Sequence, residues 1–389
     1  MVRLGEICTI QSGGTPSRSN FDYWKNGTIS WVKISDIKDK YLNFTEEHIT
    51  SEGLKNSSAK IFSKGTILYT IFATLGEVSV LNIEAATNQA IAGIKLINDD
   101  VYNDFLYYYL VSKKEEVNNI GRGVAQNNIN LSILKNFEIR IPELQEQRKI
   151  VNNLNVINKI INKRKQQLKK LDELVKSRFI EMFGDPVLNP LKWKEDFLGN
   201  YINVLTDFSA NGSYELLDSH VVMYDKPQYA IMVRTVDLES GDLQNGVKYI
   251  DKTAYELLSK SKLYGGELIM NKIGSAGKIY IMPEIKVPAS LGRNAFMFRF
   301  DERLNMTFLY LLLTSKYGTL EIQKHVRGTV TKTITKNDAR QIRIIVPPID
   351  LQNEFAAIVK QTDKSKLEIQ KSLDKLEILK KSLMQQYFG

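Results

Sequence analysis

The chain is poor in the residues that metal-dependent or nucleophilic catalysis requires. Its 389 residues include one cysteine, Cys8, and three histidines, His48, His220 and His325. A single cysteine excludes a disulfide framework and a zinc site built from thiolates. No histidine lies near another or near Cys8 in the sequence, so the pattern does not indicate a hydrolytic triad. We interpret each histidine as a surface or core-edge residue.

Other catalytic motifs are also missing. The chain has no Gly-x4-Gly-Lys-Ser/Thr phosphate loop. Val346-Pro-Pro-Ile349 lacks the amide or acid that holds the target amine in a methyltransferase loop. Glu284-Ile-Lys286, with Asp251 as a possible partner, resembles part of a nuclease site, but it has no counterpart in the other half of the chain. We therefore expect a non-catalytic protein without a metal site.

Long hydrophobic runs are absent too. No stretch approaches 18 uninterrupted apolar residues, and the first residues lack the apolar core of a signal peptide. We expect a cytoplasmic protein that does not contact a membrane.

The composition is that of a globular, basic protein. Apolar residues make up 43% and charged residues 25%, and 53 Lys and Arg against 44 Asp and Glu give a net charge of +9. That balance favours nucleic acid or another anionic partner. The length predicts two domains of about 150 residues each.

The most informative feature is an internal repeat. Phe105-Leu-Tyr-Tyr-Tyr-Leu-Val-Ser-Lys113 returns as Phe308-Leu-Tyr-Leu-Leu-Leu-Thr-Ser-Lys316, and Trp31–Ile37 returns as Met232–Leu238. Further matches are Gly123 with Gly328, Ile129 with Ile334, Pro142 with Pro347, and Phe183-Gly184 with Phe388-Gly389. A period of about 200 residues is too long for a solenoid, so it indicates a duplicated domain with a duplicated connector.

Each domain is predicted to be α+β. Short runs rich in β-branched and aromatic residues, such as 65–72, 90–96 and 296–300, alternate with turn signals. Residues 104–118 are predicted to form one helix. The domains are expected at 1–142 and 185–348, and the connectors at 143–184 and 349–389.

The connectors are predicted to be long helices. Leu144–Phe183 contains no glycine or proline, and at 1.5 Å per residue it would extend about 60 Å. Apolar residues spaced by three and four form a seam in each connector, interrupted by Arg164 in the first, and Leu379 also falls on the apolar stripe of the second. The seam residues are Ile150, Leu154, Ile157, Ile161, Leu168, Leu171 and Val175 in the first, and Phe355, Ile358, Ile369, Leu373, Leu376 and Leu383 in the second. We expect an antiparallel coiled coil and a pseudo-two-fold arrangement; the alternative is that each helix folds onto its own domain.

Polar, glycine-bearing loops recur at matched places in the two copies. Residues 121–130 and 326–336 each place an arginine beside the shared glycine, and 12–19 is a similar loop near the start. Lys33 is matched with Arg234, and Gln89 with Asn294. Such side chains can contact phosphates and base edges, although ordinary turns are the alternative. The predicted DNA contacts are Thr15, Ser17, Arg18, Lys33, Gln89, Arg122, Gln126, Asn127, Arg234, Lys272, Arg293, Asn294, Arg327, Thr331, Lys332 and Lys336.

Together these motifs resemble the specificity subunit of type I restriction-modification systems. The resemblance is carried by Leu4-Gly-Glu-Ile7, Ser12-Gly-Gly-Thr-Pro-Ser17, Leu144-Gln-Glu-Gln-Arg-Lys-Ile-Val151, Met182-Phe-Gly-Asp-Pro186 and Pro347-Pro-Ile-Asp-Leu-Gln-Asn-Glu-Phe355. It extends over essentially the whole chain. The second copy departs from the first by having Ala210-Asn-Gly-Ser213 in place of the Gly-Gly-Thr-Pro loop.

The resemblance implies two target-recognition domains that each read one half of a bipartite, asymmetric DNA site. It implies that the paired helices set the spacer and dock two DNA methyltransferase subunits, and that restriction motor-nuclease subunits join them. S-adenosylmethionine, ATP and Mg²⁺ would be bound by those partners only, so we expect no cofactor on this chain. The other hypotheses are a coiled-coil assembly scaffold whose α+β domains bind proteins, and a stand-alone nuclease.

Overall fold

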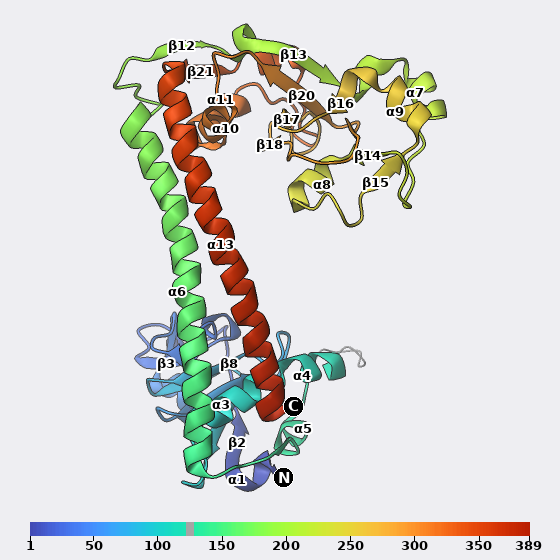
Figure 1. Ribbon diagram of the computed structural model, residues 1–389. Coiled ribbons are helices and arrows are strands. Elements are labelled where there is room, and N and C mark those ends of the chain that lie inside the picture. Colours follow the sequence, from blue (N-terminus) through green and yellow to red (C-terminus); the bar gives the residue numbers. More distant parts are fainter. Residues whose placement is uncertain (122–127) are drawn as a thin grey trace. The chain divides into compact units, whose positions relative to one another are not determined.

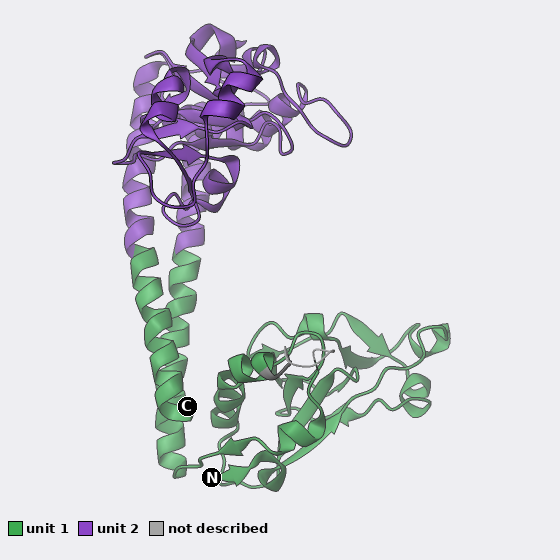
Figure 2. Ribbon diagram, turned by 90° about the vertical axis from the view of Figure 1, so that its right-hand side faces the viewer, with its two compact units in different colours: residues 1–167, 369–389 green, residues 168–368 purple. Residues whose placement is uncertain are grey.

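The computed structural model describes residues 1–121 and 128–389 (Figure 1), and the chain divides into two compact units. Unit 1 consists of residues 1–167 and 369–389, and unit 2 consists of residues 168–368. Figure 2 colours the two units separately and shows that each long helix contributes one part to each of them. The four-part division expected from the sequence assigns each helix to a segment of its own, and that division stays a prediction.

Both units contain three equivalent sheets whose equivalent strands follow the same order, except that the largest sheet of unit 1 has a fifth strand that unit 2 lacks. In unit 1 the strands are β2 (Cys8–Ser12), β10 (Ile91–Leu96), β7 (Ile67–Thr70), β8 (Val78–Leu81) and β4 (Tyr41–Leu42) in one sheet; β5 (Glu47–Ile49), β3 (Ile29–Val32), β9 (Ala85–Thr87) and β6 (Ile61–Phe62) in a second; and β1 (Val2–Arg3) with β11 (Glu138–Ile139). In unit 2 they are β13 (Ile202–Asp207), β20 (Ala295–Phe300), β17 (Leu268–Asn271) and β18 (Ile279–Ile281); β15 (Lys248–Ile250), β14 (Ala230–Val233), β19 (Ala289–Leu291) and β16 (Lys262–Leu263); and β12 (Lys194–Phe197) with β21 (Arg343–Val346). The duplication read from the sequence is therefore a duplication of fold, and the α+β prediction is confirmed.

Short helices also recur between the units. The equivalent pairs are α3 (Asn103–Ser112) and α10 (Met306–Thr314), α4 (Lys114–Gly121) and α11 (Lys316–Gln323), α5 (Leu131–Lys135) and α12 (Lys336–Arg340), and α2 (Ser51–Lys55) and α9 (Lys252–Leu257). Unit 2 also has α7 (Tyr214–His220) and α8 (Thr235–Ser240), and in unit 1 α1 (Leu4–Ile7) follows β1.

The single helix predicted over 104–118 is wrong, because α3 ends at Ser112 and α4 begins at Lys114. In unit 2 the same break is made by Ser315, which has an extended backbone and whose hydroxyl accepts a hydrogen bond from the Gly318 N–H.

The two connectors are helices of 40 residues each, α6 (Leu144–Phe183) and α13 (Ile349–Phe388). Gly184 ends α6 with a φ of +74°, a left-handed conformation that glycine adopts without a steric penalty. Pro186 follows and cannot continue a helix.

The helices run antiparallel where they meet inside each unit (Figure 2). In unit 1, Asn153 Nδ2 donates to the Tyr387 hydroxyl over 3.2 Å, and Lys165 lies 3.0 Å from Glu377. In unit 2, Asp172 lies 2.7 Å from Lys366. As residue numbers rise along α6, those of its partners fall along α13, which is the order that antiparallel helices require.

The predicted seam is found at the helix contacts in both units. Its buried members are Ile150, Leu154, Ile157, Ile161, Val175, Phe355 and Leu373, and its half-buried members are Leu168, Leu171, Ile358, Ile369, Leu376 and Leu383. Leu379 was placed on this stripe wrongly and is exposed. The spacing of three and four runs from Leu376 to Lys380 and then to Leu383. The seam position is therefore occupied by Lys380, and Leu379 lies beside the seam.

A buried glutamine fixes the start of each long helix to its domain. The Gln147 amide accepts from the Tyr102 N–H over 2.7 Å and donates to the Asp100 and Pro142 carbonyls, both at 2.8 Å. Gln352 accepts from the Asn305 N–H over 2.8 Å and donates to the Arg303 and Pro347 carbonyls. Because both side chains are fully buried and fully hydrogen-bonded, they hold the helix start in one position.

Aromatic residues join helix ends to the domain in each unit. In unit 2, Phe183 at the end of α6 lies 4.7 Å from Phe308 and 5.3 Å from Phe355, between ring centroids. In unit 1, Phe388 at the end of α13 lies 5.2 Å from Phe105. Each domain core therefore includes the end of one long helix and the start of the other.

Lys380 provides a test of the seam in unit 1. Burial lowers the pKa of the Lys380 ammonium, and Lys165 lowers it further through charge repulsion. Lys380→Leu should therefore raise the stability of unit 1 by about 1 kcal/mol at pH 7, because it removes a partly buried charge and extends the apolar seam. The urea unfolding midpoint measures this gain.

Lys375→Leu is the matched control, because Lys375 lies on the exposed side of the same helix. It should leave the midpoint unchanged. An equal gain in the two variants would show that the effect comes from leucine in a helix and not from the seam.

Candidate nucleic-acid interface

Loops from four parts of unit 1 meet at one end of its largest sheet. The Gly14 N–H donates to the Thr87 carbonyl, the Ile71 N–H donates to the Ala90 carbonyl, and the Ile129 N–H donates to the Ile71 carbonyl. We call the surface formed by residues 12–19, 71–77, 87–90 and 128–130 the loop face of unit 1. A Cβ atom on Gly13 would clash with Thr87, so the close approach of the first loop requires glycine.

Unit 2 builds the same surface from the same parts of its fold. The Lys272 N–H donates to the Asn294 carbonyl, the Ile334 N–H donates to the Lys272 carbonyl, and the Gly274 N–H donates to the Lys332 carbonyl. The loop face of unit 2 is formed by residues 207–214, 272–278, 291–294 and 327–337. The structure thus brings together residues that are far apart in the chain, including nearly all the predicted DNA contacts of this unit.

One match made from the sequence needs correction. Three residues separate β9 from β10, with Gln89 in the middle, and three separate β19 from β20, with Arg293 in the middle. The flanking hydrogen bonds agree, since Asn88 donates to Val32 as Gly292 donates to Val233. Gln89 is therefore equivalent to Arg293, and Asn294 is equivalent to Ala90.

Most of the predicted cations on the loop face of unit 2 are paired with carboxylates. Arg293 lies 2.9 Å from Asp218, and Arg327 lies 2.6 Å from Asp338. Arg234, a predicted contact outside the loop face, is held more tightly: its Nε and Nη2 donate to Asp237 at 3.0 and 2.6 Å, and Nη2 also donates to the Gly246 carbonyl. Arg234 therefore braces α8 against the following loop, and its role as a DNA contact stays a prediction.

The predicted contacts in unit 1 are engaged in the same way. The Arg18 guanidinium lies 2.5 Å from Glu47 and 3.7 Å from the centroid of the Trp24 ring. Lys33 lies 2.7 Å from Glu46 and 3.2 Å from Glu47, and the hydrogen bonds that its ammonium donates to Glu46 and then to Glu47 raise its pKa. Glu47 thus joins Arg18, which lies on the loop face, to Lys33, which lies outside it.

Among the described residues, the predicted contacts of unit 1 that carry no charge are hydrogen-bonded to one another or to neighbouring residues of the loop face. The Thr15 hydroxyl is hydrogen-bonded to the Gln89 amide oxygen, and the Ser17 hydroxyl lies 2.8 Å from that of Ser19. The contacts predicted at Arg122, Gln126 and Asn127 lie outside the described residues.

A groove marks the centre of the loop face in unit 2. Its volume is about 540 Å³, and it is lined by Asp207, Lys272, Ile273, Phe296, Thr333, Ile334, Thr335, Lys336 and Asn337. Asp207 is buried and accepts from Lys336 over 2.8 Å and from Lys272 over 2.9 Å. Asp207 was not predicted from the sequence, because its partners lie 65 and 129 residues away.

Thr331 and Lys332 are exposed on the loop that borders this groove. Arg293 lies over the rings of Phe208 and Tyr214 and lines a neighbouring pocket of about 340 Å³ with Arg234 and Asn294.

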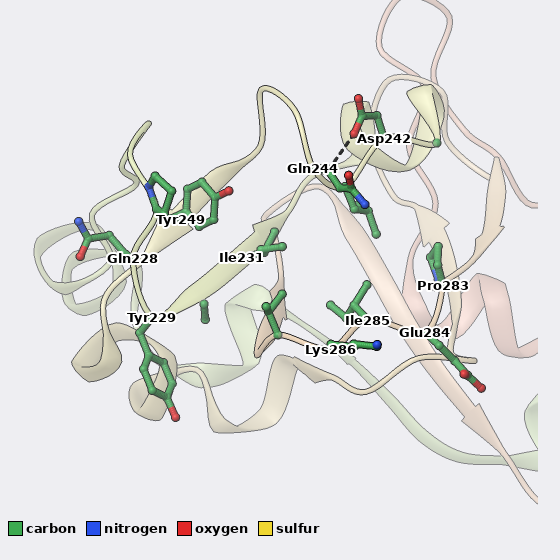
Figure 3. A pocket seen from close by; sticks show the side chains of 15 residues that line it. Gln228, Tyr229, Ile231, Asp242, Gln244, Tyr249, Pro283, Glu284, Ile285 and Lys286 are labelled. Atoms are coloured by element: carbon green, nitrogen blue, oxygen red, sulfur yellow. Dashed lines mark hydrogen bonds between the residues drawn. The ribbon is translucent and has the colours of Figure 1, made fainter.

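A larger pocket of about 860 Å³ lies elsewhere in unit 2 (Figure 3). Ile231 and Tyr249 are register partners on adjacent strands, and with Tyr229 and Ile285 they give it an apolar lining. Its charged residues are Asp242, Glu284 and Lys286, so the lining is not basic and does not suit phosphates.

The nuclease-like triplet considered from the sequence is not assembled at this pocket. Asp251 is not among its lining residues and instead caps α9, where its side chain accepts from the Ala254 N–H. Among the described residues, no group of three or more His, Cys, Asp or Glu is arranged to hold a metal ion. No described helix is both long enough and apolar enough to cross a membrane.

Two stretches of the chain, residues 1–170 and 223–379, match the family described as the type I restriction modification DNA specificity domain. The chain belongs to this specificity family. It matches the MjaIX specificity subunit of Methanocaldococcus jannaschii at 26% identity, over 98% of this chain and 90% of that one. It also matches the EcoR124I/EcoR124II specificity subunit of Escherichia coli at 24% identity, over 45% of each chain.

Solved structures show the same fold. A type I restriction-modification S subunit from M. genitalium matches with a TM-score of 0.56 at 17% identity, over 100% of this chain and 95% of that one. A structure reported for complex assembly and conformational transition of the type I system matches with a TM-score of 0.62 at 17% identity, over 100% and 96%. The specificity-subunit resemblance and the fold predicted from the sequence are thus confirmed.

Asp207 provides a test of the specificity domain in unit 2. Burial opposes its ionisation, but hydrogen bonds from Lys336 and Lys272 outweigh burial and hold its pKa below the usual range. Because the folded-state pKa is lowered, Asp207 stabilises the fold above its unfolded pKa of about 3.9 and loses this contribution as pH falls through the lower value. Asp207→Asn should cost about 2 kcal/mol at pH 7, and the difference from wild type should shrink below pH 4.

Urea unfolding at a series of pH values measures that difference. Glu302→Gln is the control, because Glu302 is an exposed acid of the same unit, and it should have little effect at any pH. A deficit for Asp207→Asn that is the same at pH 7 and pH 3 would contradict the pairing.

Proposed function

We propose that this chain is the DNA-recognition subunit of a type I restriction-modification complex. Each unit reads one half of a bipartite, asymmetric site through its loop face. The observation that carries the proposal is that both units place their loops by equivalent hydrogen bonds, while the side chains on those loops differ. Gln89 corresponds to Arg293, and Ile71 to Lys272. One frame with different polar groups suits the reading of two different sequences.

The chemistry of the loop faces supports recognition by contact rather than by bulk charge. Carboxylates hold five of the predicted cations, so the positions of these side chains are fixed before DNA arrives; the five are Arg18, Lys272, Arg293, Arg327 and Lys336. Oriented cations and amides are the groups that read base edges and position phosphates. Ion pairs that are already made must be exchanged for DNA contacts, so we expect the isolated chain to bind DNA weakly.

The long helices are the proposed docking and spacing elements. Their outward sides carry exposed apolar residues, among them Val156, Ile160 and Ile378. We propose that they dock two DNA methyltransferase subunits and fix the length of the spacer between the half-sites, and that motor-nuclease subunits join for restriction. The chain itself is proposed to be non-catalytic, with S-adenosylmethionine, ATP and Mg²⁺ on its partners.

Selection from random duplexes tests the bipartite site. The chain in complex with its methyltransferase subunits should select two short motifs at a fixed spacing, and its affinity should fall steeply as salt rises, because phosphate contacts release counterions. A single contiguous motif, or none, would contradict the proposal. Tight binding of proteins with no salt-dependent DNA affinity would favour the assembly-scaffold alternative.

Arg327→Ala tests whether the two halves are read separately. Arg327 has 73% of its side chain exposed, so its pair with Asp338 adds little stability. A loss of DNA binding in the variant would therefore reflect a lost contact with DNA and not an unfolded domain. The variant should lose about tenfold in discrimination at one half-site and none at the other. Arg122→Ala should affect the opposite half.

Arg303→Ala is the matched control. Arg303 is also an exposed arginine paired with an aspartate, Asp301. It follows the end of β20 at Phe300, whereas the loop face adjoins the start of that strand at Ala295. Binding competition with duplexes altered in one half at a time measures both variants, and equal losses at the two halves for Arg327→Ala would refute modular reading.

A further inference from the structure

An exposed apolar side chain occupies the same position on both loop faces. The loop between β7 and β8 and the loop between β17 and β18 each have seven residues, 71–77 and 272–278. Phe72 and Ile273 are the second residues of these loops. Phe72 is 47% exposed and Ile273 is 44% exposed.

The shape of these loops does not depend on Phe72 or Ile273. Leu75 and Ala276 are buried apolar residues at matched positions of the two loops, and Ile71 is also buried in the first. Gly76 and Gly277 have φ of +78° and +83° and each donates its N–H back to the last residue of the preceding strand, Thr70 or Asn271. These buried groups fix the turn, and an outward residue at the second position could be polar without loss of fold.

An apolar residue at this position carries an energetic penalty when the protein is free. Apolar surface left in water forgoes about 25 cal/mol for every Å² that burial would have gained. A single exposed apolar residue is ordinary on a protein surface. Here the same position is apolar and half-exposed in both units, although an aromatic ring stands in one and a branched aliphatic chain in the other.

The surroundings of both residues are polar and belong to the proposed DNA-reading loops. Phe72 forms an antiparallel bridge with Asn128, and Ile273 forms one with Thr333. Ile273 also lines the groove that contains Lys272 and Lys336. Each apolar side chain therefore stands in a hairpin loop at one end of the larger sheet, next to the polar groups proposed above to contact phosphates and base edges.

From this placement we propose that Phe72 and Ile273 make the apolar base contact of each half-site. The ligand surface is an apolar part of a base, either the 5-methyl group of thymine at the groove edge or the face of a base that has been unstacked. Contact removes the exposed side chain from water, and the neighbouring polar groups set its position. The proposal rests on the DNA-recognition function proposed above and assigns one specificity-determining residue to each unit.

Phe72→Ala and Ile273→Ala test this assignment in the complex with the methyltransferase subunits. Repeating the selection from random duplexes should show that each variant loses about tenfold in preference at one position of one half-site. The half affected should differ between the two variants. Thermal unfolding should be unchanged, because neither side chain shapes the turn.

Phe44→Ala and Val287→Ala are the matched controls for units 1 and 2. Both residues are exposed. Phe44 follows β4, whose Leu42 pairs with Leu81 at the end of β8 remote from the 71–77 loop, and Val287 follows β18 beyond the end remote from the 272–278 loop. Neither control should alter affinity or preference.

Two modified duplexes identify the base surface. Uracil in place of thymine at the affected position should weaken wild-type binding and leave the alanine variant unaffected if the methyl group is contacted. A rise in 2-aminopurine fluorescence at that step, lost in the variant, would identify an unstacked base instead. Either result supports the proposal.

The proposal is overturned if both variants keep wild-type affinity and preferences while the wild-type complex selects a bipartite site. That outcome leaves the DNA-recognition function standing. A wild-type complex that selects no bipartite site would instead remove the function on which the proposal rests.

Discussion

The pairing of α6 with α13 is the constraint on which both units depend. Unit 1 is completed by residues 369–389, which are remote in sequence from the rest of it, and unit 2 is one continuous stretch that takes in the end of α6 and the start of α13. The core of unit 1 includes Leu154 from α6 and Met384 from α13, and the core of unit 2 includes Phe183 from α6 and Phe355 from α13. The buried amides of Gln147 and Gln352 then fix where each helix begins. A change in one helix is therefore felt in the core of a domain that is remote in sequence, and this ties the connectors to the recognition domains more closely than a flexible linker would.

The buried parts of the fold around each loop face are the same in the two units, and the exposed side chains differ. Strand order, backbone hydrogen bonds and the positive-φ glycines recur in the two units, whereas Gln89 and Arg293, or Phe72 and Ile273, differ at matched positions. The sheets place these side chains, and the side chains carry the difference in chemistry. Pairing with carboxylates such as Asp207 and Asp338 holds the cations in place. A shared backbone with different exposed side chains is what a protein with two recognition modules requires.

Much of this architecture could be predicted because it depends on residue types and spacings that are visible within short stretches of the sequence. The absence of glycine and proline and the spacing of apolar residues define α6 within one residue at each end, and the repeat of Trp31–Ile37 in Met232–Leu238 reports true structural equivalence. What could not be predicted depends on contacts between distant residues. Asp207 meets lysines 65 and 129 positions away, and the match of Gln89 with Arg293 is set by strand register. The exposure of Phe72 and Ile273 was hidden as well, because apolar residues beside a strand look like core in the sequence.

The central claim is that each unit presents its loop face to DNA. Hydrogen–deuterium exchange of the complex with its methyltransferase subunits, measured with and without a duplex that carries the selected site, tests it most directly. The account predicts that DNA slows exchange in 12–19, 71–77 and 87–90 of unit 1 and in 207–214, 272–278, 291–294 and 327–337 of unit 2. Protection confined to the opposite ends of the sheets, around Phe44 and Arg303, or to α6 and α13 alone, would contradict it.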